Sequence, residues 1–390
     1  MAVSLRQLYE RIRHAEEIQL VAGEAGLDHP VRWVHMVEGT DISSFLEGDE
    51  VAFATGIALK GAEDLLKLVR YNQKQGAAGM VINVGPYIEE IPPEVIAFGN
   101  EKEFPVFRVP WRVHMANIMR EFTTQINMDD FKEMEVEAAL KNAIFLPENT
   151  DMYLPALKKH GYKKEWSYCV AVLEVWDKTG MRMTERFKKK LLRYASDFFR
   201  AYQRQSAVLE NDGAMAVFFC NVTEDAVKEQ LSLFVGSVRE YLSEDFCCYM
   251  GIGRCAGEAG KIAASFAQAE QVRRLQKKRG RKNEPVMYSE LGLYKLLFSL
   301  ENQEVMEEYY TETLGVLEKY DHVNETDYLY FLSKYFALDC SVQELAAQMH
   351  LHRNSVTYKL HKIEEILKLS VNDPADRTKL MVAFMIREIR

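Results

Sequence analysis

The chain has 390 residues, of which 48% are hydrophobic and 27% charged, with a net charge of -9. This length suggests about two to three domains, and the composition excludes a disordered or fibrous protein. The longest uncharged stretch, residues 75–88, has 14 residues and contains Asn83 and Pro86, so it is too short and polar to span a bilayer. The charged N-terminus lacks the apolar segment of a secretory signal. We therefore expect a cytoplasmic protein with no membrane partner.

The six cysteines and the net charge further limit the classes of function that this protein can have. No two cysteines form a C-x-x-C pair, and no Cys and His residues have zinc spacing. We expect reduced, mostly buried thiols and no metal or cofactor. The acidic net charge does not exclude a nucleic-acid partner, because such binding depends on local cationic patches. The cysteines are Cys169, Cys220, Cys247, Cys248, Cys255 and Cys340.

Residues 1–115 alternate short apolar runs with amphipathic segments. An opening helix is predicted from Leu5 and a second helix over residues 62–75. Pro92 and Pro93 are expected to break a helix. Strands are predicted at residues 31–37, 51–54, 79–84 and 106–109. This alternation favours an α/β domain with a largely parallel sheet.

Residues 112–146 contain neither proline nor glycine, which indicates a long connecting helix that we place at residues 116–146. Ile118, Phe122 and Ile126 recur at every fourth position, and Met134 and Ala138 continue this apolar spacing. Two alternatives follow: the helix packs on its own domain, or its apolar stripe pairs with a second copy of the chain.

Residues 165–289 carry the pattern of a second α/β domain. Asp212 and Gly213 between two apolar runs indicate a tight hairpin. The order β-α-β-β-α-β is that of a ferredoxin-like domain. The strands are expected at residues 167–175, 206–210, 214–220 and 246–253, and the helices at residues 185–202, 225–242 and 262–279.

Residues 290–390 are helical in pattern, and residues 341–367 indicate a helix-turn-helix. Ser341 followed by Glu344 is a capping box, and the small Ala346 allows a second helix to approach the first. Val356, Leu360, Ile363 and Leu367 share one face of that second helix. Two helices this short and this tightly joined must cross steeply, as in DNA-binding modules.

The other face of the second helix offers DNA-binding side chains. Arginine reads guanine and asparagine reads adenine in the major groove. Between His352 and Lys362 there are three Lys or Arg residues and no acid, which favours an anionic partner. The alternative is an ordinary helix pair, and His350 stands where glycine is common in such turns. We expect base contacts from Arg353, Asn354, Thr357 and Tyr358, and phosphate contacts from Ser355, Lys359, His361 and Lys362.

Several of these residues also carry a family resemblance. Residues 352–360 and 362–364, followed by 372–374 with Arg377 and Leu380, resemble the C-terminal helix-turn-helix of the PucR (purine catabolism regulator) family and of related sugar-diacid regulators. The first block resembles the N-terminal PucR domain, and the middle block the GGDEF-like domain between them. The matching N-terminal positions are residues 22–23, 26–28, 31–35, 38, 41 and 54–56.

The resemblance covers nearly the whole chain and implies a bacterial transcription regulator, often an activator, that senses a purine, an amino acid or another nitrogenous metabolite. The expected fold is multidomain: an α/β sensor domain (1–115), the connecting helix, a degenerate GGDEF-like domain (165–289) and an all-α domain (290–390). The expected partners are promoter DNA, a small-molecule effector and another copy of the chain, as a homodimer or higher homo-oligomer, because one such module reads few bases.

A competing hypothesis is a nucleotidyl cyclase or a cyclic-nucleotide-binding signalling protein. Active cyclase domains carry Gly-Gly-Asp/Glu-Glu-Phe in the hairpin, where carboxylates bind two metals and glycines let the nucleotide approach. Here residues 210–215 read ENDGAM, without paired glycines or the Glu-Phe pair. Glu174 and Asp177 could mimic a metal ligand, but we expect solvated strand-end carboxylates. We predict no cyclase activity and no catalytic residue.

Two further features leave alternatives open. Residues 273–282 hold seven basic residues in ten. This run is either a second contact to DNA phosphate or RNA polymerase, or a solvated helix end that stops at Gly280. We favour the solvated helix end.

The first block offers a candidate ligand site, because ligands of parallel sheets bind beyond the carboxyl ends of the strands. A site for a planar nitrogenous ligand is therefore expected there, unless its residues form only a turn and core. Its candidate residues are Glu38, Thr55, Gly56, Arg108 and Trp111.

Overall fold

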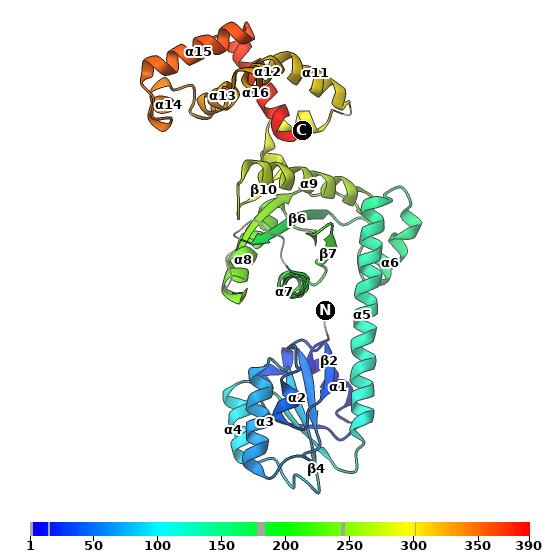
Figure 1. The fold of residues 1–390 in the computed structure, drawn as a ribbon. Helices are drawn as coiled ribbons and strands as arrows, with labels where there is room; N and C mark the ends of the chain where they lie inside the picture. Colours follow the sequence, from blue (N-terminus) through cyan, green and yellow to red (C-terminus); the bar gives the residue numbers. More distant parts are fainter. Residues whose placement is uncertain (1–2, 15, 178–183, 243–245, 301) are drawn as a thin grey trace. The chain divides into compact units, whose positions relative to one another are not determined.

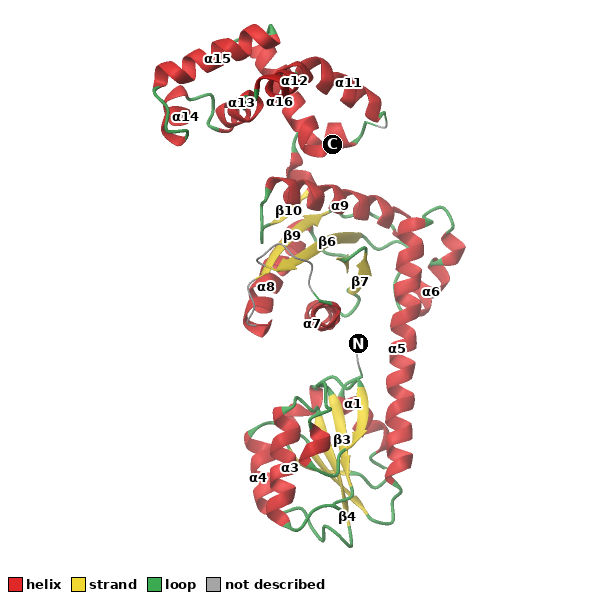
Figure 2. Ribbon diagram, in the orientation of Figure 1, coloured by secondary structure: helices red, strands yellow, loops and turns green. Residues whose placement is uncertain are grey.

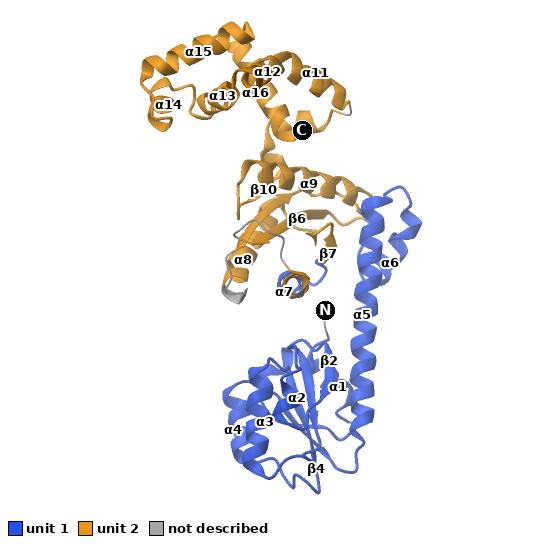
Figure 3. Ribbon diagram, viewed as in Figure 1, with its two compact units in different colours: residues 1–164, 193–207 blue, residues 165–192, 208–390 orange. Residues whose placement is uncertain are grey.

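The computed structural model describes residues 3–14, 16–177, 184–242, 246–300 and 302–390. The chain forms two compact units: residues 1–164 with 193–207, and residues 165–192 with 208–390 (Figure 3). Figure 1 follows the elements along the chain, and Figure 2 separates helices from strands. Within the described ranges, no helix is long and apolar enough to cross a membrane.

An α/β domain occupies the first part of the chain. Its sheet has the order β1-β5-β4-β3-β2, in which β2 to β5 run parallel and β1 pairs antiparallel with β5. The largely parallel sheet is confirmed, whereas β1 was not predicted. The elements are α1 (Leu5–Ile12), β1 (Gln19–Ala22), β2 (Trp33–Met36), α2 (Thr40–Ser43), β3 (Glu50–Ala54), α3 (Ala62–Lys74), β4 (Gly79–Val84), α4 (Pro93–Glu101) and β5 (Val106–Pro110), with a 3-10 turn at Glu24–Asp28.

Both faces of this sheet are buried, which explains why its strands read as continuous apolar runs. One face packs on α1 and on the start of the long helix α5, and the other packs on α3 and α4. The expected helix break at Pro92 and Pro93 is wrong: Pro93 is the first residue of α4. Proline suits that position because the first helical N–H has no intrahelical partner.

The connecting helix α5 (Met115–Phe145) is confirmed, and the short α6 (Leu154–Lys159) contacts it after a 3-10 turn at Thr150–Met152. Ile118, Phe122 and Ile126 are buried in the core of the α/β domain. The continuation of the stripe is wrong, because Met134 is 65% exposed and Ala138 is exposed as well. Each step of four residues turns about 40° beyond a full helical turn, so the stripe leaves the buried face.

The middle domain has the predicted β-α-β-β-α-β order. Its sheet has the order β10-β9-β6-β8-β7, with β6 antiparallel to β8 and β9; the edge strand β10, parallel to β9, was not predicted. Gly253 lets α9 lie against β9, because a Cβ there would sit 1.9 Å from the carbonyl oxygen of Ser265. The elements are β6 (Tyr168–Asp177), α7 (Glu185–Tyr202), β7 (Ala207–Asn211), β8 (Ala214–Cys220), α8 (Glu224–Leu242), β9 (Phe246–Ile252), α9 (Ile262–Arg279) and β10 (Pro285–Met287), with a 3-10 turn at Ala259–Lys261.

The C-terminal region is helical, as predicted. Its helices share one apolar core, which also includes Val272 and Leu275 of α9. This continuity joins the helical region to the sheet-bearing domain within the second unit. The helices are α10 (Tyr294–Phe298), α11 (Gln303–Thr313), α12 (Gly315–Asn324), α13 (Tyr328–Ala337), α14 (Val342–Gln348), α15 (Arg353–Leu367) and α16 (Pro374–Ile389), after a 3-10 turn at Tyr288–Leu291.

Candidate nucleic-acid interface

The helix pair α14–α15 forms where the sequence places it. Ser341 caps α14, with its hydroxyl accepting a hydrogen bond from the Glu344 N–H at 3.2 Å. This is the Ser341 half of the predicted capping box. His352 caps α15, with Nδ1 accepting a hydrogen bond from the Asn354 N–H at 3.3 Å. Both caps satisfy amide donors that have no intrahelical partner.

A four-residue turn, residues 349–352, separates the two helices. His350 has a φ of 53°, in the left-handed region, and the Leu351 N–H bonds back to the Ala346 carbonyl at 2.9 Å. Glycine enters this region without steric cost, which is why it is common in such turns. His350 therefore performs the turn that glycine usually makes, at some cost in backbone strain.

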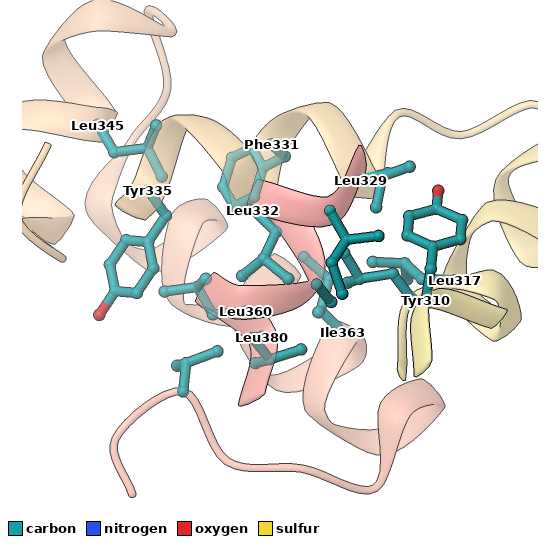
Figure 4. Packing of buried hydrophobic residues seen from close by; sticks show 14 of the residues in the cluster. Tyr310, Leu317, Leu329, Phe331, Leu332, Tyr335, Leu345, Leu360, Ile363 and Leu380 are labelled. Carbon is teal, nitrogen blue, oxygen red and sulfur yellow. The ribbon is translucent and has the colours of Figure 1, made fainter. Parts of the chain in front are cut away.

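The inner face of α15 is anchored in the C-terminal core. Val356, Leu360 and Ile363 are buried, as predicted, and Leu367 is partly buried. Figure 4 places Leu360 and Ile363 among side chains of α13, α14 and α16. Leu345 and Ala346 of α14 belong to the same cluster. This packing holds one face of α15 inward and leaves the other exposed to solvent.

The outer face of α15 carries the predicted base-reading side chains. Arg353, Asn354 and Thr357 are exposed, and Tyr358 is 69% exposed. The Thr357 hydroxyl donates a hydrogen bond to the Arg353 carbonyl at 3.1 Å. Arginine and asparagine forks exposed near the start of such a helix suit base edges in the major groove.

The predicted phosphate-binding residues divide into two groups. Ser355 and His361 are exposed, and His361 lies 3.2 Å from Glu364. Lys359 instead turns toward α13: it lies 3.4 Å from Asp327 and over the Tyr328 ring at 5.7 Å. Lys359 thus has an intramolecular position that the sequence did not predict.

Lys362 is also engaged, because its ammonium lies 2.9 Å from Glu365. This hydrogen bond raises the pKa of Lys362 and lowers the pKa of Glu365. An exposed pair of this kind has little net stability. A phosphate could therefore replace the Glu365 carboxylate at small cost.

The family-like residues after α15 form its supporting loop. Glu364 accepts hydrogen bonds from the Ser370 hydroxyl and the Val371 N–H, at 3.0 and 2.9 Å. Asp373 caps α16, and Arg377 donates to the Val371 carbonyl at 3.0 Å. These residues hold the end of α15 rather than contact a ligand.

The N-terminal ligand-site residues are largely engaged in contacts within their own domain. Both oxygens of Glu38 are used inside the loop: Oε1 accepts from the Thr55 N–H and hydroxyl at 2.8 and 2.7 Å, and Oε2 from the Gly56 N–H at 3.0 Å. Arg108 donates to Gln19 of β1 at 2.8 Å. Trp111 is exposed and makes an edge-on contact with Tyr87, with ring centroids 5.6 Å apart. The Glu38 carboxylate therefore stabilises the conformation of the loop that contains Thr55 and Gly56.

The middle domain forms the predicted hairpin, but it places the Glu174 carboxylate differently from our expectation. Asp212 and Gly213 both have positive φ, as a tight two-residue turn requires. Glu174 is not solvated, contrary to our expectation: it is 9% exposed, bonds to Arg273 and lies 2.8 Å from Lys277. Two cations neutralise this carboxylate, and the described residues include no cluster of three metal-binding side chains.

The basic run at the end of α9 is largely committed to intramolecular pairs. Arg273 and Arg274 bind Glu270, Arg279 lies 2.9 Å from Glu388 of α16, and Lys278 donates to the Arg390 carbonyl. Gly280 ends the helix with a φ of 67°, as predicted. The favoured interpretation, a solvated helix end, is wrong in one respect: these cations tie α9 to β6 and α16.

The sequence alone did not identify the residues that orient α15. Asp321 accepts three hydrogen bonds at the start of α13, from the Tyr328 and Leu329 N–H groups and the Thr326 hydroxyl. Asp321 lies within α12, seven residues before Tyr328, so it is not at the N-cap position that a sequence pattern would identify. Asp327 was likewise missed as the partner of Lys359.

The fold and this interface together define a multidomain protein with a helix-turn-helix at its C-terminal end. Three family models match it: the purine catabolism regulatory protein-like family over residues 8–126, the GGDEF-like domain over 149–275 and the PucR C-terminal helix-turn-helix domain over 328–386. The chain thus contains a PucR-type N-terminal domain, a GGDEF-like middle domain and a PucR-type C-terminal helix-turn-helix domain.

Individual relatives match smaller parts of the chain. The purine catabolism regulatory protein of Bacillus subtilis (strain 168) is 31% identical over 126 residues, or 32% of this chain and 23% of that protein. The proline-responsive transcriptional activator PutR of the same organism is 28% identical over 35% of this chain and 34% of that protein. The alignments thus span about a quarter and a third of these relatives.

Among solved structures, the regulator of polyketide synthase expression from Bifidobacterium adolescentis has a TM-score of 0.31. It is 16% identical to this chain, and the comparison covers 66% of this chain and 92% of that chain.

Proposed function

We propose that this protein is a sequence-specific DNA-binding transcription regulator that responds to a small metabolite. The observation that carries the proposal is the outer face of α15, where Arg353, Asn354 and Tyr358 are exposed while the opposite face is buried in the core. The exposed side chains are of the types that read base edges, and the buried face holds them at a fixed orientation. The relatives' names as regulators support this assignment.

The direct test is selection of genomic DNA fragments by the purified full chain, followed by footprinting of the enriched fragments. We expect a small set of fragments with related half-sites separated by about one helical turn, roughly 10 base pairs. Uniform recovery of fragments, or no recovery above a bead control, would contradict the proposal. The experiment is performed at a stated salt concentration, because non-specific binding depends strongly on salt.

We propose that the effector binds the N-terminal α/β domain at the carboxyl edge of its parallel strands. Ligands of such sheets lie there, and the exposed Tyr87–Trp111 pair supplies a wall for a planar molecule. Glu38, with Thr55 and Gly56, shapes the adjacent loop, and Arg108 remains a candidate contact. Purine intermediates and proline are the first compounds to test, because the relatives' names refer to purine catabolism and to proline.

Thermal-shift measurements with these compounds test the effector proposal. A stabilising compound should lose its effect in Trp111→Ala, while Trp33→Ala, an exposed tryptophan on β2, serves as the matched control. If both variants respond like the wild type, the binding site lies elsewhere.

We propose that the middle domain is not catalytic. The salt-bridged Glu174 and the hairpin ENDGAM support a role in relay or assembly rather than cyclic dinucleotide synthesis. Formation of a cyclic dinucleotide from GTP and Mg²⁺ by the purified protein would establish the competing cyclase function. We also propose that the protein activates transcription and contacts RNA polymerase. Transcription assays on an enriched promoter test both points.

A further inference from the structure

The middle domain places two cysteines opposite each other on neighbouring strands. β6 and β9 pair antiparallel, and just beyond their regular ladder Tyr168 and Ala256 exchange both backbone hydrogen bonds, at 2.7 and 2.8 Å. The Gly253 N–H also donates to the Val170 carbonyl, at 2.9 Å. Between these two pairings, Arg254 and Cys255 lie opposite the single residue Cys169, as in a β-bulge. Cys169 and Cys255 are therefore neighbours across the two chain segments.

This position is compatible with a disulfide. Disulfides accept Cα separations of about 4.4–6.8 Å, which is the range found between facing residues of antiparallel strands. Each thiol shifts the pKa of the other, that of Cys169 upward and that of Cys255 downward. Their sulfur atoms also approach backbone carbonyls, Cys169 Sγ that of Gly253 at 3.4 Å and Cys255 Sγ that of Val222 at 3.1 Å. Little backbone movement would be needed to join them.

The two thiols differ in a way that suits stepwise oxidation. Cys169 is buried, whereas Cys255 is only partly buried and open to a small oxidant. The hydrogen bond from Cys169 lowers the pKa of Cys255, although burial and the nearby Glu224 act against it. The same hydrogen bond, together with burial, raises the pKa of Cys169. Because the thiolate is the reactive form, Cys255 is the thiol that reacts with an oxidant first.

The remaining cysteines of the middle domain are less suited to this chemistry. Burial raises the pKa of Cys220 to about 12. Cys247 and Cys248 are neighbours on β9 and point to opposite faces of the sheet. Cys340 lies in the C-terminal helical region, and it is partly buried there.

We propose that Cys169 and Cys255 form a reversible intramolecular disulfide when the protein reacts with a peroxide. The Cys255 thiolate attacks the peroxide oxygen of H₂O₂, which gives a sulfenic acid and releases hydroxide. The Cys169 sulfur then attacks the Cys255 sulfur; the S–O bond breaks, and the departing hydroxide takes the thiol proton to leave as water. Overall, two thiols are oxidised and one peroxide is reduced to two waters, and an added dithiol reverses the reaction.

Mass spectrometry of the full chain tests this site. After stoichiometric H₂O₂ and quenching with an alkylating agent, we expect a mass lower by two hydrogens relative to the unmodified thiol pair and a linked peptide joining Cys169 to Cys255. Dithiothreitol should restore two alkylatable thiols. The linked peptide should be absent in Cys255→Ser and unchanged in Cys340→Ser, the matched control.

Two outcomes would overturn the proposal. One is oxidation of the folded wild type that leaves Cys169 and Cys255 both alkylatable after Cys340 has reacted. The other is a linked peptide that joins different cysteines or two copies of the chain. Wild-type peptide mapping decides between these results even if Cys255→Ser folds poorly, because it needs no substitution.

Discussion

Arg353 has no ion-pair partner among the residues that the structure describes, whereas neighbouring cations on α15 pair with Glu365 or Asp327. An exposed guanidinium without an intramolecular partner is available for a bidentate contact to guanine. Its position at the first turn of a helix that is anchored by Val356 and Leu360 fixes where it points. These features make Arg353 the most informative single residue of the interface.

Arg353→Ala is expected to cost about 1–3 kcal/mol of binding free energy and to relax base preference at one position of the site. The change removes the proposed base contact without altering the buried face of α15, so the melting temperature should stay the same. Binding is measured by anisotropy on the selected DNA and on variants of each base pair. Arg11→Ala, an exposed arginine of α1, removes the same charge elsewhere. Equal and equally selective binding by Arg353→Ala would place the reading face elsewhere.

Glu270 links stability to pH. Burial raises the pKa of Glu270, but hydrogen bonds from Arg273 and Arg274 outweigh it, so the pKa is lowered overall. A carboxyl group with a lowered folded pKa contributes stability above its unfolded pKa and loses it as pH falls through the folded value. Hydrogen exchange in α9 should therefore accelerate as pH falls below about 4.3, the ordinary value for glutamate, after correction for the intrinsic exchange rate. Glu270→Gln should abolish this dependence; an unchanged profile would assign it to another group.

At the scale of elements, the turn between α14 and α15 depends on one residue in the left-handed region. His350→Val is expected to lower the free energy of unfolding by about 1–2 kcal/mol, because a β-branched side chain clashes in this conformation. Urea unfolding followed by helical circular dichroism measures the change. The matched variant His350→Gly should be as stable as the wild type or slightly more so. Equal stability of the valine variant would mean that the turn has another backbone conformation.

The cationic end of α9 is a second element whose role the tertiary structure decides. Neutralising Lys277, Lys278 and Arg279 to glutamine should leave the salt dependence of DNA binding unchanged, because these cations contact Glu174, Arg390 and Glu388. A phosphate contact would instead reduce the salt slope by about 1 for each lysine or arginine lost. We expect lower thermal stability, since a buried carboxylate loses one of its two partners. A shallower slope with unchanged stability would restore the DNA-contact interpretation.

At the scale of the whole molecule, α5 exposes large apolar side chains after it leaves the N-terminal core. Met128 and Phe131 are each 60% exposed, and Met134 lies on the same stretch. An apolar helix stripe of this kind suits pairing with a second copy, which would supply two recognition helices for two half-sites. The first half of α5 packs on its own domain, as one of the two alternatives predicted. Pairing of the exposed stretch at residues 128–134 with a second copy remains our proposal.

Phe131→Glu is expected to shift the protein toward monomer and to weaken binding to a paired site by about tenfold or more, with little effect on a single half-site. The charge is costly only if a partner buries this position. Sedimentation velocity and binding to both DNA lengths give the result. Met152→Glu, an exposed apolar position outside α5, is the control. An unchanged oligomeric state would exclude this stretch from the assembly surface.

The sequence by itself determined the order of elements and the inner and outer faces of α15, because local periodicity of 3.6 or 2 residues and capping residues act within a few positions. It also predicted the hairpin at Asp212-Gly213, because the positive φ angles of such a turn depend only on the residues within it. Only the tertiary structure decided which charges meet. Glu174 and Arg273 are 99 residues apart along the chain, and Lys359 finds Asp327 through the packing of two helices. Such pairs depend on how elements cross and register, and residue spacing along the chain carries no information about that.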